Sequence, residues 1–493
     1  MTRTSTAIDT MAHLKISTFA TFQAALNGRS LTDFATDKAR ALLVYLVVER
    51  QQPHRRESLA ALLWPDQPDA RARQSLRQAL SNLRQVLSDD SVPRPILLVD
   101  RHEVQVNPQA EIWLDVAEFA ALAETCHRHH HRQTSACLPC LQRREAMLAL
   151  YPGDFLAGFS PADSSLFDEW VLLKREWLHQ QAIEALTQVA DFYERRGDLP
   201  TARRFAQQQV HLEPWREEAH RQLMRLLAQE GQRSAALAQY EACRRALARE
   251  LGIAPTAETV ALYTAVRDAT FPSTAEPRPT ASHLPQAVTP FIGRATECAE
   301  LADMLANPDG RLVTLMGPGG IGKSRLALQV AGEHIGLYTH GVFWAALGAI
   351  QTAALIVPTI AQAIGFALYG KEPPQAQLMA YLRQKQMLLV LDSTEHLPEA
   401  GEVIMALLQN APGVILLVTS RQRLALREEW LYAVEGLPYE EKAAADPAPS
   451  EAAQLFIHSV QRTYRKFAPT AADWAALSDI CRLVEGMPLA LEL

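Results

Sequence analysis

The segment GPGGIGKS at residues 317–324 demands a particular local fold. It satisfies the pattern G-x-x-x-x-G-K-[ST], and the apolar run Leu312 to Met316 before it suits a buried strand. In such a strand–loop–helix unit, backbone N–H groups close around phosphates and the helix adds its positive dipole end. The predicted phosphate site consists of the loop glycines, a lysine that neutralises phosphate and a serine that binds Mg²⁺: Gly317, Gly319, Gly320, Gly322, Lys323 and Ser324.

Two further apolar runs predict that this region is a parallel α/β sheet. The run Met387 to Leu391 would deliver Asp392 to the carboxyl edge of the sheet, where an acidic residue can help to hold Mg²⁺. The run Val414 to Val418 would bring Arg421 to the same edge, within reach of a γ-phosphate. Taken alone, Arg421 would more often be an ordinary surface residue.

The first hundred residues predict a small sheet, three helices and a hairpin. Residues 14–31 alternate between polar and apolar in short runs, and Asn27-Gly28 suits a type I′ turn. The helices and hairpin strands are expected in this order: 39–47, 57–64, from Asp69 onward, 96–99 and 103–106.

The third of these helices has two chemically different sides. Leu76, Leu80 and Leu83 recur at helical spacing and must face a core, whereas no acid occurs between Ala70 and Ser88. Arginines and amides on an exposed helix suit phosphate oxygens and base edges in a major groove. The predicted DNA contacts lie here and in the hairpin turn: Arg71, Arg73, Gln74, Arg77, Gln78, Ser81, Arg84 and Arg101.

A solvated polar face is the simpler interpretation of such a helix in isolation. The order of sheet, three helices and hairpin favours DNA binding, because it resembles the winged-helix domain of response-regulator type.

The next segment is helical and contains a repeat of 34 residues. Matched positions include Val189 with Leu223, Gly197 with Gly231 and Ala202 with Ala236. Thirty-four residues is the tetratricopeptide period, in which a turn joins two helices that pack closely. A generic helical bundle is the alternative.

Residues 12–270 together resemble the SARP-type bacterial activators, whose winged helix precedes a tetratricopeptide-like activation domain. The resemblance includes YPGDFLAGF at 151–159 and ARELGIAPTAET at 248–259. It implies binding to double-stranded promoter DNA, often as a dimer, and contact of the middle domain with RNA polymerase or other proteins.

Residues 289–493 resemble the NB-ARC class of STAND ATPases through FIGR at 291–294, the P-loop, TSR at 419–421 and GMPL at 486–489. The resemblance implies ATP or ADP as ligand, Gly293 and Arg294 lining the adenine pocket, Arg421 reading the γ-phosphate, and Pro488 packing on the base. Ser393 follows Asp392 where the class has a second acid, which leaves Glu395 as the candidate for orienting water. The apolar end of the chain resembles a truncated product.

A histidine-rich segment has the spacing H-x3-H-x5-C-x2-C, formed by His127, His131, Cys137 and Cys140. Two imidazoles one helical turn apart could meet a Cys-x-x-Cys pair around tetrahedral zinc. The order of ligands is the reverse of an ordinary zinc finger. A solvated histidine-rich insertion is the simpler alternative.

These patterns predict a multidomain chain, α+β and then α/β, because 493 residues exceed one hydrophobic core. The expected parts are a disordered tail, a winged helix-turn-helix domain, an α-helical tetratricopeptide-like domain, a proline-rich linker and a P-loop NTPase domain with a parallel sheet: 1–11, 12–108, 109–270, 271–288 and 289–493.

The net charge of −7 argues against nonspecific coating of nucleic acid and requires a local basic patch for DNA binding. Without an apolar leader or membrane-length run, we expect a cytoplasmic protein. The leading hypothesis is a DNA-binding transcriptional activator controlled by ATP or ADP, which could form a nucleotide- or DNA-dependent oligomer. An ATP-hydrolysing remodelling enzyme with protein-interaction domains, or a tetratricopeptide scaffold, is the alternative.

Overall fold

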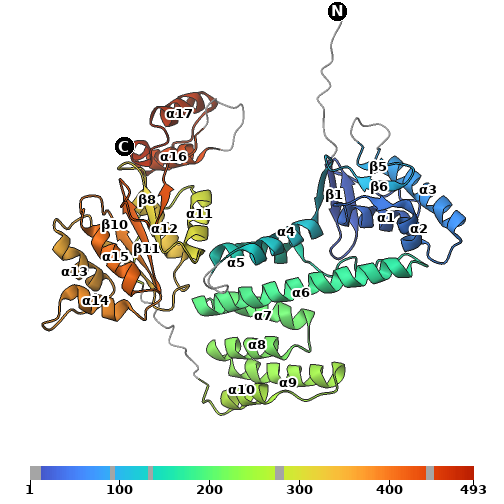
Figure 1. Ribbon diagram of the computed structural model, residues 1–493, viewed down its shortest axis with the longest axis horizontal. Coiled ribbons are helices and arrows are strands. Elements are labelled where there is room, and N and C mark those ends of the chain that lie inside the picture. The colour runs from blue at the N-terminus through green and yellow to red at the C-terminus, as the bar shows by residue number, and fades with distance from the viewer. Residues whose placement is uncertain (1–12, 89–94, 131–136, 272–281, 440–448) are drawn as a thin grey trace, which may run out of the picture. The chain divides into compact units, whose positions relative to one another are not determined.

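The computed structural model describes residues 13–88, 95–130, 137–271, 282–439 and 449–493. The expected tail at 1–11 and most of the linker at 271–288 lie outside these residues. The chain divides into two compact units, residues 1–129 with 142–189 and residues 130–141 with 190–493, and each unit is described by itself (Figure 1). In the part of the chain that the structure describes, no helix has both the length and the hydrophobicity needed to cross a bilayer.

The head opens with a sheet of four strands in the order β3-β2-β1-β7. Strand β1 runs antiparallel to β2 and parallel to β7. The strand bounds are β1 His13–Ser17, β2 Gln23–Leu26, β3 Arg29–Ser30 and β7 Glu111–Leu114. Because β7 pairs with β1, this sheet includes residues beyond 108.

Three helices and a second sheet complete the head. The helices are α1 Asp37–Val48, α2 Arg56–Leu63 and α3 Asp69–Val86. The second sheet has the order β4-β6-β5, with β4 His54–Arg55, β5 Leu97–Val99 and β6 Glu103–Val106, all antiparallel. The predicted succession of sheet, helices and hairpin is confirmed.

The helical domain follows in seven helices: α4 Asp115–Arg128, α5 Leu138–Leu150, α6 Ser165–Arg196, α7 Leu199–Leu212, α8 Glu217–Gln229, α9 Arg233–Glu250 and α10 Ala257–Arg267. The expected repeat appears in the turns between them. Gly197 and Gly231 have φ of 79° and 75°, a left-handed conformation that favours glycine. Ala202 and Ala236, five residues after each glycine, are both fully buried.

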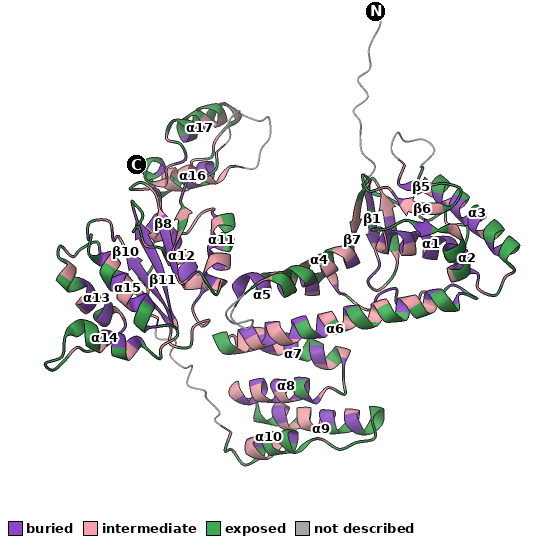
Figure 2. Ribbon diagram, viewed as in Figure 1, coloured by how far each residue is buried: buried purple, intermediate pink, exposed green. Residues whose placement is uncertain are grey.

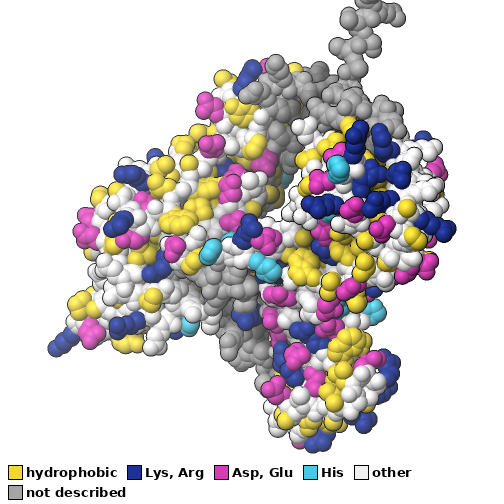
Figure 3. All heavy atoms as spheres, turned by 45° about the vertical axis from the view of Figure 1, so that its right-hand side comes forward, with side chains coloured by type: hydrophobic (Ala, Val, Ile, Leu, Met, Phe, Trp, Pro, Cys, Tyr) yellow, Lys and Arg dark blue, Asp and Glu magenta, His cyan; other side chains and the backbone are white. Residues whose placement is uncertain are grey.

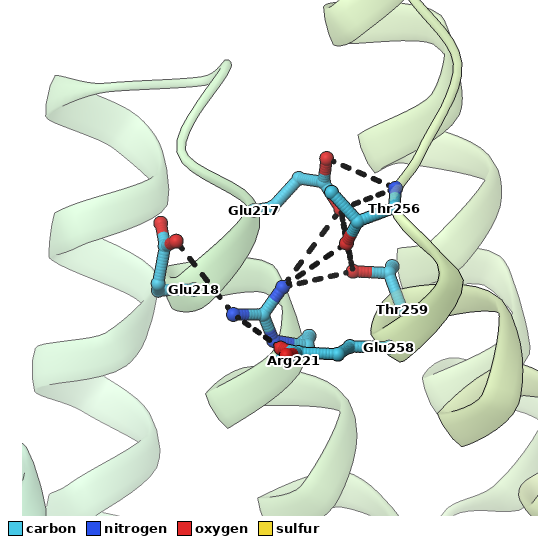
Figure 4. A network of polar contacts seen from close by, with 6 residues as sticks. All are labelled: Glu217, Glu218, Arg221, Thr256, Glu258 and Thr259. Carbon is cyan, nitrogen blue, oxygen red and sulfur yellow. Dashed lines mark hydrogen bonds and ion pairs between the residues drawn. The ribbon is translucent and has the colours of Figure 1, made fainter.

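A buried carboxylate joins α8 to the start of α10 (Figure 4). Glu217 accepts hydrogen bonds from the Thr256 backbone N–H at 3.0 Å, from the Thr256 hydroxyl at 2.8 Å and from the Thr259 hydroxyl at 2.5 Å. The guanidinium of Arg221 lies 3.9 Å from the same carboxylate and donates to Thr259 at 3.2 Å. The sequence APTAET therefore supplies the hydroxyls that hold α10 against α8.

The C-terminal region is built on a parallel sheet in the order β12-β8-β11-β10-β9. Its strands are β8 Leu312–Met316, β9 Val342–Ala346, β10 Met387–Asp392, β11 Val414–Ser420 and β12 Glu429–Ala433. The predicted α/β fold class is confirmed. Figure 2 shows β8, β9, β10 and β11 largely buried, whereas the edge strand β12 is intermediate to exposed.

Helices cover both faces of this sheet. The side chains of β10 alternate, so that Leu389 packs in one core and Leu388 in the other. The helices of this region are α11 Ala295–Ala306, α12 Lys323–Glu333, α13 Ile356–Ala363, α14 Pro374–Leu382 and α15 Ala400–Asn410, with a short η3 turn at Ala353–Leu355. A small bundle then follows, made of α16 Glu451–Thr463, α17 Ala471–Leu483 and α18 Pro488–Glu492.

Candidate nucleotide and DNA sites

The P-loop connects β8 to α12 and has the backbone geometry that its glycines predict. Gly320 and Gly322 have φ of 82° and 97°. A Cβ on Gly320 would approach Leu489 to 2.8 Å, and one on Gly319 would lie 3.3 Å from the Arg421 guanidinium. Positive φ and close neighbours therefore both favour glycine in this loop.

Lys323 is the first residue of α12, and its side chain folds back into the loop. Its ammonium donates to the carbonyls of Gly317 at 2.8 Å and Pro318 at 3.0 Å. Burial lowers the pKa of Lys323, although the nearby carboxylate of Glu395 acts in the opposite direction. The charge thus sits where phosphate oxygens enter a loop of this kind.

Ser324 and Asp392 come together although they are far apart in the chain. The Ser324 hydroxyl donates to Asp392 Oδ1 at 2.6 Å, and the Thr419 hydroxyl donates to the same oxygen at 2.6 Å. Asp392 ends β10 and Thr419 lies on the neighbouring β11, so the parallel sheet brings both to one edge. A hydroxyl and a carboxylate at this edge fit the oxygen ligands that Mg²⁺ prefers.

Arg421 and Glu395 form an ion pair at the same edge, with 3.2 Å between Nε and Oε1. Arg421 is largely exposed, at 65% of its side-chain surface. The second oxygen of Glu395 is buried without a hydrogen-bond partner among the described residues. Both residues thus lie near the phosphate loop.

A cavity of about 370 Å³ lies beside the P-loop, within the usual size of small-ligand sites of roughly 300–1,000 Å³. Gly320, Gly322 and Lys323 form its phosphate-loop side. Apolar side chains from the segment before α11 and from the C-terminal bundle form its other walls: Phe291, Ile292, Leu437, Leu455, Pro488 and Leu489. An apolar wall opposite a phosphate loop suits a nucleotide base, and Pro488 is part of this wall.

Arg294 borders this cavity, but its guanidinium has mainly a supporting role. It is only 2% exposed and donates to the carbonyls of Ile321 at 2.8 Å and Glu435 at 2.9 Å. Burial lowers the pKa of Arg294, while Glu297 opposes this shift. The side chain therefore ties the P-loop to the segment that leads into the C-terminal bundle.

Gly293 makes room for a residue that the sequence did not single out. Glu451, at the start of α16, accepts a hydrogen bond from the Arg294 backbone N–H at 2.8 Å. A Cβ on Gly293 would lie 2.2 Å from the Glu451 carboxylate, and φ of Gly293 is 70°. Gly293 is thus required by the approach of Glu451.

Helix α3 turns its apolar side inward, as its spacing predicts. Leu76, Leu80 and Leu83 are at most 3% exposed. The predicted DNA-contact residues of this helix are all exposed: Arg71, Arg73, Gln74, Arg77, Gln78, Ser81 and Arg84. Figure 3 shows Lys and Arg side chains on the face of the head turned to the viewer.

Neighbouring contacts hold parts of this surface in place. Arg73 forms an exposed ion pair with Glu57 of α2 at 3.2 Å. In the β5–β6 hairpin, the Asp100 carboxylate accepts from the backbone N–H groups of His102 and Glu103 at 2.7 and 2.6 Å. Arg101 is therefore exposed at the tip of a well-defined turn.

The structure tests only part of the predicted zinc-binding set. Cys137 and Cys140 lie close together at the start of α5, with their sulfur atoms within 4.8 Å of each other. His127 lies in the last turn of α4, and His131 lies outside the described residues.

The folds and sites define a class of protein in which a winged-helix head precedes a helical repeat domain and a P-loop nucleotide-binding domain. Two family models match the chain: the bacterial transcriptional activator domain over residues 114–267 and the NB-ARC domain over residues 294–427. The chain therefore carries the activator domain that is typical of SARP-type regulators, together with an NB-ARC domain, whose kind binds nucleotides.

Three proteins are similar to parts of this chain. The regulatory protein AfsR of Streptomyces griseus is 25% identical over 502 residues, covering 95% of this chain and 47% of AfsR. An uncharacterized protein of Mycobacterium tuberculosis is 31% identical over 207 residues, covering 42% of this chain and 50% of that protein. The structure of Mycobacterium tuberculosis EmbR in complex with a low-affinity phosphopeptide has a TM-score of 0.41 at 23% identity, covering 55% and 70% of the two chains. The chain spans about half the length of the curated relatives that it matches.

Proposed function

We propose that this chain is a transcriptional activator that binds double-stranded promoter DNA and whose occupancy there is set by ATP or ADP. The observation that carries the proposal is the geometry of the P-loop. The Lys323 ammonium lies inside the loop, and the Ser324 hydroxyl donates a hydrogen bond to Asp392. The same chain carries α3, whose arginines and amides are exposed.

The head would contact DNA through α3 and the hairpin tip. Arg73 and Arg77 lie one turn apart and can reach base edges or phosphates of one groove. Arg101 would contact backbone phosphate. The remaining exposed residues would complete the contact: Arg71, Gln74, Gln78, Ser81 and Arg84.

The nucleotide would lie with its phosphates in the P-loop and its base against the apolar wall that includes Pro488. Lys323 would neutralise phosphate charge, and Ser324 and Asp392 would hold Mg²⁺. Arg421 would respond to a γ-phosphate, since its guanidinium already approaches Gly319. Arg294 and Gly293 would hold the adenine side of the pocket together.

The helical repeat domain would contact RNA polymerase or other proteins, because stacked helix pairs present extended surfaces for partners. Nucleotide or DNA would favour an oligomer, which binds repeated sites more tightly than one head does.

Selection of bound genomic fragments by the full chain tests DNA binding. On the selected site, Arg77→Ala should cost about 1–3 kcal/mol if Arg77 reads a base, or weaken all sequences and lower the salt slope by about one if it contacts phosphate. Arg244→Ala, an exposed change on α9, is the control. Unchanged binding in Arg73→Ala, Arg77→Ala and Arg84→Ala would remove α3 from the interface.

ATP titration of the full chain tests the P-loop. Lys323→Ala should abolish detectable ATP binding, whereas Lys371→Ala, at an exposed position of the same domain, should not change it. Retained micromolar affinity in Lys323→Ala would contradict the assignment.

A second candidate function is sustained ATP hydrolysis coupled to remodelling. The observation in its favour is Glu395, which has a buried, unpartnered oxygen among the described residues and could orient water. Turnover above roughly 1 per second, the low end of ordinary enzymes, that falls in Glu395→Gln would favour this function. Slower turnover would favour the first proposal, in which the bound nucleotide controls DNA occupancy.

A further inference from the structure

The segment at residues 289–294, called here the base-side segment, forms one wall of the nucleotide cavity without adopting a helix or a strand. Phe291 packs against the core of the sheet, and Ile292 packs against the C-terminal bundle. Pro290 has no backbone N–H to donate. Side chains from elsewhere in the domain therefore supply hydrogen bonds that hold this segment in place.

Arg325 supplies such bonds at the start of the base-side segment. It is the third residue of α12, two positions after Lys323, and it lines the same cavity. Its guanidinium donates to the Thr289 hydroxyl, to the Thr289 carbonyl and to the Pro290 carbonyl, the last at 2.7 Å. A guanidinium can serve several oxygens at once because its donors are fixed in one plane.

The far end of the base-side segment is held by a different element. The Arg294 N–H donates to the Glu451 carboxylate of α16 at 2.8 Å. Phe291 and Ile292 lie between the two attachments. Because Arg325 belongs to the helix that follows the P-loop, its hydrogen bonds connect the wall of the cavity to the phosphate loop.

We propose that Arg325 is a positioning residue for nucleotide binding, which holds the base-side segment where the base can contact it while the phosphates occupy the P-loop. This inference rests on the proposed nucleotide site and adds a determinant of affinity to it. A wall that is held in place before binding favours affinity, because the segment need not be ordered when the ligand arrives. Lysine at this position would keep the charge but lose the planar set of donors.

Two ligands separate positioning from simple attraction of charge. ATP would use both the P-loop and the base-side segment, whereas tripolyphosphate would use the P-loop alone. In the Arg325→Lys variant of the full chain, ATP affinity should fall about tenfold, the effect of roughly one hydrogen bond from a charged donor, and tripolyphosphate affinity should change less than about twofold. Calorimetric titration in the presence of Mg²⁺ measures both affinities.

Arg311→Lys is the matched control. Arg311 also donates to three carbonyls, those of Leu408, Ala411 and Val414, but it is not among the described residues that line the cavity. This variant should leave the ratio of ATP affinity to tripolyphosphate affinity unchanged, even where it lowers the stability of the domain.

The outcomes distinguish this inference from the proposed function. An unchanged ratio of the two affinities in Arg325→Lys would overturn the role of Arg325 and leave the nucleotide assignment standing. An equal loss of affinity for both ligands would also overturn it, because it would indicate direct contact of Arg325 with phosphate. A wild type that binds neither ligand would contradict the proposed function itself.

A second variant and a second measurement extend the test. Thr289→Val removes one acceptor and keeps Arg325, so it should lower ATP affinity by a smaller factor and leave tripolyphosphate affinity unchanged. Without any ligand, the backbone amides of Phe291 and Ile292 should exchange hydrogen faster in Arg325→Lys than in the wild type or in Arg311→Lys. Equal exchange rates in all three proteins would contradict the proposal.

Discussion

Single side chains in this protein often act by joining distant segments. Arg294 is buried between the P-loop and the segment before the C-terminal bundle, and Glu217 is buried between α8 and α10. A buried polar group stabilises only when its hydrogen bonds are made. The loss of either side chain should therefore destabilise its domain beyond the loss of one contact.

For Arg294 we expect a stability effect. Arg294→Met should cost about 3 kcal/mol, because it leaves the Ile321 and Glu435 carbonyls without their charged donor. Denaturant unfolding followed in the NTPase domain measures this. Arg423→Met, at an exposed position, is the control and should change stability by less than about 0.5 kcal/mol.

For Glu217 we expect a dependence on pH. Burial by itself raises the pKa of Glu217, but hydrogen bonds from Thr259 and Thr256 outweigh it, and the folded-state pKa lies below the ordinary value. Its contribution to stability is therefore present above the ordinary pKa and is lost as the pH falls through the folded-state value.

Unfolding of the wild type and Glu217→Gln measures this difference. At neutral pH the variant should be less stable by about 1–3 kcal/mol, and the gap should close in acid. Glu258→Gln changes a 78% exposed member of the same network, so a similar loss there would contradict a special role for Glu217.

At the scale of elements, the sequence predicted what short-range patterns determine. The P-loop, the strand before it and the amphipathic character of α3 follow from the spacing of glycines and leucines. The Thr419 bond to Asp392 and the Glu451 bond to Arg294 could not be predicted, because they join positions 27 and 157 residues apart.

The repeated turn gives a prediction at this scale. Gly231→Ala should destabilise the helical domain by about 1–2 kcal/mol, since φ is 75° although no atom lies within 4 Å of the added Cβ. Gly332→Ala adds the same methyl group within α12 without a positive φ or close neighbour and should be neutral or stabilising. Thermal unfolding of both variants decides this.

At the scale of the whole molecule, the proposed function requires coupling between nucleotide and DNA. By linkage, if ATP changes DNA affinity by some factor, DNA must change ATP affinity by the same factor. Lys323→Ala should keep the DNA affinity of the nucleotide-free wild type and lose the response to ATP. If ATP changed the DNA affinity of the wild type by one factor and DNA changed its ATP affinity by another, the two binding measurements would not report one equilibrium.

None of the six cysteines of this protein forms a disulfide, all six are buried, and they are distributed among its parts. Cys243 lies in the repeat helices, Cys298 in α11 and Cys481 in α17. A buried thiol reacts with an alkylating reagent only when its surroundings open. The unmodified chain therefore carries its own reporters, and peptide mass spectrometry after timed alkylation would give an opening rate for each part without an introduced label.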